Sequence, residues 1–392
     1  MESYLQRLEE LYPEMIDIRR HFHQYPELSF QEVNTPEKIA QYLTELGIEV
    51  RTGVGGRGVV GTIYGGKLGK TVALRADFDA LPIQDEKDVP YKSTIPGVMH
   101  ACGHDAHTST LLAVAKVFSE RKDELQGNLV LIHQFAEEIT PGGAKPMIED
   151  GCLDGVDAIF STHVWSPIPV GQIGYRSGPT MAAADRFEID ISGKGGHGAS
   201  PHTTVDPIAI GISIVQQLQQ IVSRRVDPLK PAVLTVAAFN AGNMFNVIPS
   251  TAKITGTVRT FDVEVQDEII AHMEKIIASN CENAGATFHF NYQKGYPAVI
   301  NSERETEIVA TVAASLVGKE NTFEMPANMI GEDFSYYLQN VPGTMFFTGA
   351  GNIEKGIDYP HHHGKFDIDE KSMLIAAKVL VAATLDYLNN NE

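Results

Sequence analysis

The chain has 392 residues, enough for two or three domains and a large buried core. Hydrophobic residues make up 43% and charged residues 21%, which is the balance of an ordinary globular protein. The formal net charge of −19 argues against nucleic acid or an anionic membrane surface as a partner, because both require a basic face.

The cysteine content and the hydropathy pattern indicate the compartment. Three cysteines are too few and too scattered for a disulfide framework and fit a reducing environment. The first residues, MESYLQRLEELYPEM, lack the basic and apolar regions of a signal peptide. The sequence contains no run of about 18 apolar residues, so no membrane span is expected. We therefore expect a cytoplasmic protein that does not bind membranes.

Helical and extended patterns alternate along the first part of the chain. Apolar residues recur at helical spacing over residues 3–24, and a second helix is expected over 35–46. The following pattern predicts strands at 58–64 and 71–75, a helix at 108–119, and strands at 128–135 and 158–162. Apolar strands interleaved with helices predict an α/β fold with a mixed, mostly parallel sheet and flanking helices.

Residues 185–293 follow a different pattern. Strands are expected at 187–192, 233–239, 254–261 and 287–292, with helices at 207–225 and 263–283. This β-α-β-β-α-β order predicts a ferredoxin-like α+β domain. A helix at 303–316, a strand at 345–348 and a helix at 370–388 then return to the first pattern. We predict a discontinuous domain of residues 1–184 and 294–392, interrupted by an inserted domain of residues 185–293.

Polar side chains gather where the predicted strands of the first domain end. These residues are one aspartate pair, Asp77 and Asp79, one glutamate pair, Glu137 and Glu138, and a single histidine, His163. The motif HACGHDAH lies between these strands, and a run of three histidines, 361–363, follows a later strand. Ligands of open parallel sheets bind beyond the carboxyl ends of the strands. The clusters therefore predict one shared site.

The residue types favour metal binding. Cys102 and His104 can converge on one ion through a loop at Gly103, and cysteine, histidine and carboxylate ligands suit zinc. Imidazole with carboxylate also admits manganese, cobalt or nickel. Together with one glutamate, His163 and one late histidine, they give five ligands. Five is too many for one tetrahedral ion but suits two divalent ions that share a bridging ligand.

The adjacent glutamates predict hydrolytic chemistry. Neighbouring residues in extended chain point to opposite sides, so one glutamate can bind metal while the other handles protons. A metal ion lowers the pKa of its water, and a nearby carboxylate can take the proton and return it to a leaving amine. Asp77 and Asp79 are candidates for orienting the ligand histidines, and we favour Asp79 for that role.

These motifs resemble the M20 family of metallopeptidases, and most of all its amidohydrolase branch of hippurate hydrolases, aminoacylases and auxin-conjugate hydrolases. The resemblance rests on HACGHDAH, on Glu137–Glu138, on His163 and on HHHGKFDIDE. The segments RRHFHQYPELSFQE, GGHGASPHTTVDPI, FNVIPS and GTVRTF extend it nearly end to end. It implies a catalytic domain with two metals and an inserted domain that closes over the substrate and commonly forms a homodimer.

The resemblance also assigns roles. Cys102 would bridge the two ions, where most of the wider family has aspartate, and Glu137 would be the general base. The remaining metal ligands would be His104, Glu138, His163 and His362. The late motif has Gly364 where the family usually has proline, so His361 and His363 stay open as alternatives to His362.

Three residues of the inserted domain resemble substrate-binding groups of the family. His197 would stabilise the oxyanion, sometimes from the partner subunit, while Asn246 and Arg259 would hold the substrate carboxylate. The implied enzyme hydrolyses the amide bond of N-acyl amino acids with a hydroxide that bridges the metals. The alternatives are a dimetal dipeptidase or carboxypeptidase and a non-catalytic metal- or ligand-binding protein. The acyl group stays open.

Overall fold

The structure is a computed structural model, and it describes residues 1–389. The chain divides into two compact units. Unit 1 consists of residues 1–180, 300–326 and 333–392, and unit 2 consists of residues 181–299 and 327–332. The predicted domain bounds of 184 and 294 lie within six residues of the divisions at 180 and 300. The short segment 327–332 belongs to unit 2, whereas the prediction places it in the discontinuous first domain.

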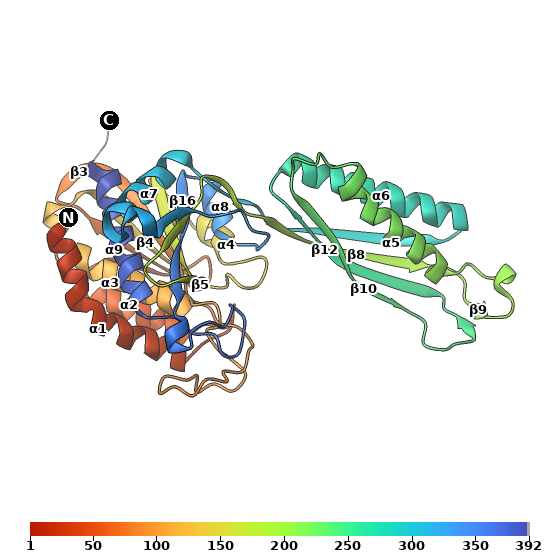
Figure 1. Ribbon diagram of the computed structural model, residues 1–392, viewed down its shortest axis with the longest axis horizontal. Coiled ribbons are helices and arrows are strands. Elements are labelled where there is room, and N and C mark those ends of the chain that lie inside the picture. Colours follow the sequence, from red (N-terminus) through yellow and green to blue (C-terminus); the bar gives the residue numbers. More distant parts are fainter. Residues whose placement is uncertain (390–392) are drawn as a thin grey trace. The chain divides into compact units, whose positions relative to one another are not determined.

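Unit 1 is built around an eight-stranded mixed sheet with the strand order β1-β2-β4-β3-β5-β16-β6-β15 (Figure 1). Its central pairs β4-β3, β3-β5 and β5-β16 are parallel, whereas β1-β2 and β2-β4 are antiparallel. The strands are β1 (Glu49–Val54), β2 (Gly58–Tyr64), β3 (Lys67–Asp77), β4 (Gln126–Gln134), β5 (Ala158–Pro169), β6 (Ile173–Tyr175), β15 (Thr322–Glu324) and β16 (Gly343–Gly351). This arrangement confirms the predicted fold class.

The helices of unit 1 bury apolar stripes against this sheet and against one another. Helices α3 and α9 pack on its central strands, and α1 packs across both of them. The helices are α1 (Glu2–Gln24), α2 (Asn34–Glu45), α3 (His104–Ser119), α4 (Ala144–Glu149), α7 (Glu303–Val317), α8 (Phe334–Leu338) and α9 (Lys371–Asn389). Two short strands, β7 (Gly178–Met181) and β14 (Val299–Asn301), pair with each other.

Helix α9 is long and apolar enough to cross a membrane by length and composition alone. However, 72% of its most apolar window is buried inside the protein, where α9 packs against α1, α3, α7 and four strands of the sheet. Burial of this kind is typical of the central helix of a folded domain.

Unit 2 is a four-stranded antiparallel sheet in the order β10-β12-β8-β13, with α5 and α6 packed on it. This is the ferredoxin-like arrangement that the sequence predicted. Its strands are β8 (Ala183–Ser192), β10 (Ala232–Ala241), β12 (Thr251–Thr260) and β13 (Thr287–Tyr296), and its helices are α5 (Pro207–Arg224) and α6 (Val263–Ala284). A small ribbon of β9 (Gly196–His197) and β11 (Val247–Ile248) extends from it and was not predicted.

Local chemistry explains where the helices of unit 2 begin and end. The Asp206 carboxylate accepts a hydrogen bond from the Ile208 amide, and Asp262 does the same for Glu264, so both helices have an N-cap. Helix α6 ends at Gly285, whose φ of 72° suits glycine.

Candidate metal centre

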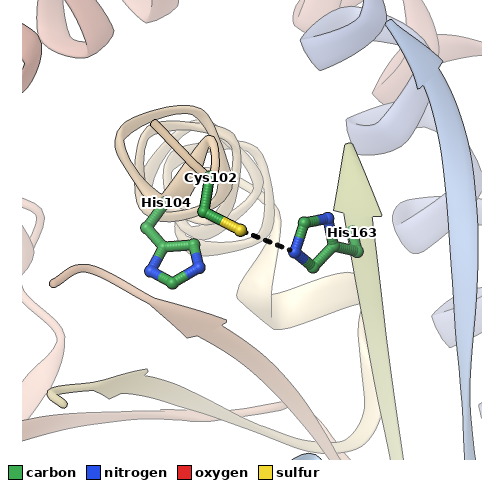
Figure 2. Close-up of side chains that lie close together, drawn as sticks. All are labelled: Cys102, His104 and His163. Carbon is green, nitrogen blue, oxygen red and sulfur yellow. Dashed lines mark hydrogen bonds between the residues drawn. The ribbon is translucent and has the colours of Figure 1, made fainter. Parts of the chain in front are cut away.

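Gly103 brings Cys102 and His104 against strand β5. It precedes α3 with a φ of 96°, and a Cβ atom at this position would lie 2.4 Å from Cγ2 of Val164. Glycine therefore avoids both a strained φ and a collision with the Val164 side chain. The close approach places the Cys102 sulfur 3.5 Å from Nε2 of His163 (Figure 2).

Cys102, His104 and His163 form one group of possible ligands. One donor atom from each lies within 4.8 Å of the others. Nδ1 of His163 donates to the Val164 carbonyl at 2.6 Å, so its Nε2 carries the lone pair that faces Cys102. Burial, with His107 nearby, lowers the pKa of His163 well below its usual value, which keeps the ring neutral.

Cys102 also belongs to a second group, with Glu138 and His362. Nε2 of His362 lies 3.4 Å from Oε2 of Glu138. The side chain of His362 is 53% exposed, whereas that of Glu138 is only 7% exposed. Because one sulfur is common to both groups, the geometry suits two ions that share Cys102 as a ligand.

Two buried atoms at the centre have no hydrogen-bond partner among the described residues: Nε2 of His104 and Oε1 of Glu138. They lie 3.8 Å apart. Nδ1 of His104 is 3.0 Å from Oδ1 of Asp79, so the free Nε2 points into the site. Buried polar atoms without partners are costly, and a divalent cation that replaced the proton of His104 would satisfy both atoms. The donor set therefore fits a metal.

Asp79 connects the two ligands by hydrogen bonds. Besides contacting His104, its carboxylate accepts the Glu138 amide at 3.0 Å and the Ser29 hydroxyl at 2.7 Å. The orienting role predicted for Asp79 is consistent with these contacts. Ser29 was missed, since nothing in the sequence relates it to the motif.

Each of the neighbouring histidines already has at least one ring nitrogen in a hydrogen bond. In His107, Nδ1 lies 2.6 Å from the Asp77 carboxylate and Nε2 accepts the Val164 amide at 2.9 Å. His361 is half-buried and its Nε2 accepts the Ser166 amide, and Nδ1 of His363 accepts the Lys365 amide. Of the three late histidines, His362 is the one whose ring nitrogen approaches Glu138.

One positional expectation was wrong. His163 was placed at the end of a strand over residues 158–162, but β5 continues to Pro169. Pairing with β3 stops at Ser161, whereas the ladder with β16 continues through His163. At His163, strand β5 therefore pairs with β16 but no longer with β3, and the His163 side chain faces Cys102.

The charges of the site make metal uptake depend on pH. Burial raises the pKa of the Cys102 thiol well above its usual value, and the Glu138 carboxylate raises it further. Burial would lower the pKa of His104, but the Asp77 and Asp79 carboxylates outweigh it and raise it to about 10. In the metal-free protein both ligands thus carry a proton at neutral pH.

We expect metal uptake at pH 8 to release about two protons, because both ligands must lose theirs before they can bind. Affinity should therefore rise with pH, and it should rise less steeply above about pH 10, where His104 has lost its proton but the Cys102 thiol has not. Calorimetry in buffers of different ionisation enthalpy counts the protons. The Cys102→Ala variant should release one fewer, and an unchanged count would show that the thiol is not a ligand.

The structure does not bring together all the predicted residues of unit 2. Asn246 lies beside His197 on the small ribbon, where its carbonyl accepts the Gly198 amide at 2.8 Å. Arg259 lies near the opposite end of β12. The eight positions from Thr251 to Arg259 correspond to about 26 Å along the strand. Asn246 and Arg259 of one chain therefore cannot hold the same carboxylate.

Two overlapping ligand groups, a shared sulfur and an additional buried carboxylate, Glu137, describe the centre of a metal-dependent hydrolase. Comparisons with known proteins agree. A model of peptidase family M20/M25/M40 matches residues 73–386. The chain therefore belongs to this family of hydrolytic enzymes.

Relatives cover nearly the whole chain. YhaA of Bacillus subtilis, which is provisionally named an amidohydrolase, is 55% identical over 97% of this chain and 96% of its own length. The N-acetyl-L-cysteine deacetylase of the same organism is 42% identical over 100% and 92%. A solved Bacillus subtilis structure, described as a dinuclear metal binding peptidase of the M20 family, is 35% identical, covers 98% of this chain and 99% of its own, and has a TM-score of 0.85.

Proposed function

We propose that the chain hydrolyses the amide bond of N-acyl amino acids with two divalent ions, drawn from zinc, manganese, cobalt and nickel. The observation that carries this proposal is the doubled ligand set around Cys102 with Glu137 beside it. A carboxylate oxygen of Glu137 lies within 4.8 Å of ligand atoms of both His104 and Glu138. A protein that merely bound metal would not need this additional carboxylate.

The chemistry divides between the ions and the chain. Cys102, His104, Glu138, His163 and His362 would hold the ions, which when bound would acidify water and polarise the amide carbonyl. Glu137 removes the proton of the attacking water and delivers it to the leaving nitrogen. His197 donates a hydrogen bond to the oxyanion that develops on the carbonyl oxygen.

Arg259 is suited to the free carboxylate of the substrate. Its guanidinium is half-buried and donates to the carbonyls of Met329 and Val258, and no carboxylate pairs with it among residues 1–389. Burial lowers the pKa of Arg259, and the nearby Asp185 carboxylate offsets this only in part. An anionic ligand would supply a paired negative charge.

Replacing Arg259 by Met should lower kcat/KM for N-acyl amino acids by about 10- to 100-fold, because a charged hydrogen bond contributes about 1.5–3 kcal/mol. The corresponding N-acyl amino acid amides lack the carboxylate and should be poor substrates of the wild type. Their kcat/KM should change little in the Arg259→Met variant. An equal loss for both substrates would show that Arg259 does not recognise the carboxylate.

The separation between Arg259 and the His197 ribbon favours a homodimer. If a small substrate meets both groups, they come from different copies of unit 2. We propose that His197 and Asn246 act on the substrate held by the partner subunit.

Mixed dimers test this arrangement. The Glu137→Gln and His197→Ala variants should each be nearly inactive alone. Unfolded and refolded together, they should recover about a quarter of wild-type activity, since half the dimers are mixed and each mixed dimer has one intact site. No recovery, with mixed dimers shown by mass spectrometry, would place His197 in the same subunit as its site.

The substrate class is tested with a panel. Stripped enzyme is reloaded with each metal and given acetyl and benzoyl amino acids beside dipeptides, and release of free amine is measured. We expect acyl amino acids to exceed dipeptides in kcat/KM. The alternative, a dipeptidase on the same centre, shares its chemistry with the peptidase relative and would give the reverse order.

A further inference from the structure

The two glutamates of the site follow an unusual backbone turn. Strand β4 ends at Gln134, and Ala136 then adopts a φ of 50°. A residue other than glycine is disfavoured in this left-handed region and stays there only where its surroundings hold it. Ala136 is completely buried and immediately precedes Glu137. The direction of both glutamate side chains therefore depends on what holds this turn.

Hydrogen bonds hold the turn on both sides. The Ala136 amide donates to Oε1 of Glu32 at 3.0 Å, and the Ala136 carbonyl accepts the Gly143 amide at 3.1 Å. Gly143 can approach because it lacks a side chain: a Cβ atom there would lie 1.9 Å from the Phe135 carbonyl oxygen. Glu32 is thus the side chain that fixes the amide just before the catalytic pair.

Glu32 is itself firmly placed. It ends the segment ELSFQE, residues 27–32, which the metal-centre chemistry does not use directly. The Glu27 carboxylate anchors the far side of this segment by accepting the amides of Val33, Asn34 and Thr35 at the start of α2. The Phe30 ring packs edge-on against Phe135 at 5.8 Å. The Arg57 guanidinium donates to the Glu32 carbonyl.

We propose that Glu32 is a positioning residue, which holds Ala136 in its left-handed conformation and so directs Glu137 and Glu138 to their separate tasks. It acts through the backbone and does not touch the substrate. This inference rests on the proposed function for its kinetic consequence, but its effect on metal binding through Glu138 does not require any substrate.

The acceptor oxygen, not a negative charge, is what the turn needs. Burial raises the pKa of Glu32 to about 8, so a neutral carboxyl group is compatible with its surroundings. A neutral carboxyl still accepts a hydrogen bond through its carbonyl oxygen, and so does an amide. Gln should therefore replace Glu32, whereas Met, which has similar length but no acceptor, should not.

The test compares Glu32→Gln and Glu32→Met with a matched Glu14→Met variant. Glu14 accepts hydrogen bonds from Tyr42 and Lys116 between helices, away from the turn. For each protein, metal affinity is measured by titration of the stripped enzyme, and kcat and KM are measured with excess metal on whichever panel substrate wild type hydrolyses.

We expect Glu32→Met to lower kcat about 100-fold with KM changed less than threefold, since a displacement of about 1 Å can cost that much. Its affinity for one of the two ions should fall about 10- to 100-fold. Glu32→Gln should stay within about threefold of wild type in both readouts, and Glu14→Met should lose thermal stability but neither activity nor metal.

Wild-type metal affinity and kcat in folded Glu32→Met would overturn the proposal. If that variant does not fold, Glu32→Gln decides alone: retained function supports the acceptor role, and a loss of function above 30-fold contradicts it. A wild-type enzyme inactive on the whole panel would instead count against the proposed function, while the metal titrations would still test Glu32.

Discussion

Replacing Glu137 by Gln is expected to lower kcat by about 10²- to 10⁴-fold, the range for loss of a general acid and base. The side chain is buried, with 7% of its surface exposed, and its carboxylate lies among the ligand atoms of His104 and Glu138. Gln has the same shape but cannot take a proton from water. The defect should therefore appear in kcat rather than in KM.

The same variant should still bind both ions, because Glu138 and not Glu137 shares a group with Cys102 and His362. Metal analysis after gel filtration measures this directly. Glu138→Gln is the matched control and should lose metal as well as activity. Wild-type turnover by Glu137→Gln would remove Glu137 from the mechanism.

The second large effect concerns Cys102, the one residue common to both ligand groups around His163 and His362. In the proposed two-ion centre, replacing it by Ala would remove a ligand from each ion at once. Bound metal should fall below two ions per chain, and activity should fall about 10³-fold or more, since metal ions contribute several kcal/mol to such reactions.

Cys102→Asp separates the loss of a ligand from disturbance of the fold. A carboxylate can also bridge two ions, so this variant should recover two bound ions and a large part of the activity. Metal content by mass spectrometry and kcat are measured for both variants. If Cys102→Ala kept two tightly bound ions, the shared-ligand arrangement would be wrong.

The sequence predicted the framework because its signals are local. The alternation of apolar strands and helices identified the mixed sheet, and the βαββαβ order identified the ferredoxin-like unit. Cys102 and His104 could be paired because they lie two positions apart. The short strands β6, β9 and β11 were missed, since two or three residues carry too little pattern to detect.

The supporting residues could not be predicted, since their contacts join distant parts of the chain. Glu32 and Ala136 are 104 positions apart, and Ser29 and Asp79 are 50 apart. His107 is a partial exception. It lies three positions after His104 on α3 and so shares a helix face with it, but only the structure shows that Asp77 and Val164 occupy both its ring nitrogens.

The central claim is that two ions at the Cys102 centre drive hydrolysis of an acyl amino acid. Stripped enzyme titrated with each candidate metal, with bound ions and released amine measured in the same samples, tests it most directly. The account predicts amine release that reaches its maximum as the second ion binds. No release at two bound ions per chain, for any metal and any substrate of the panel, would contradict it.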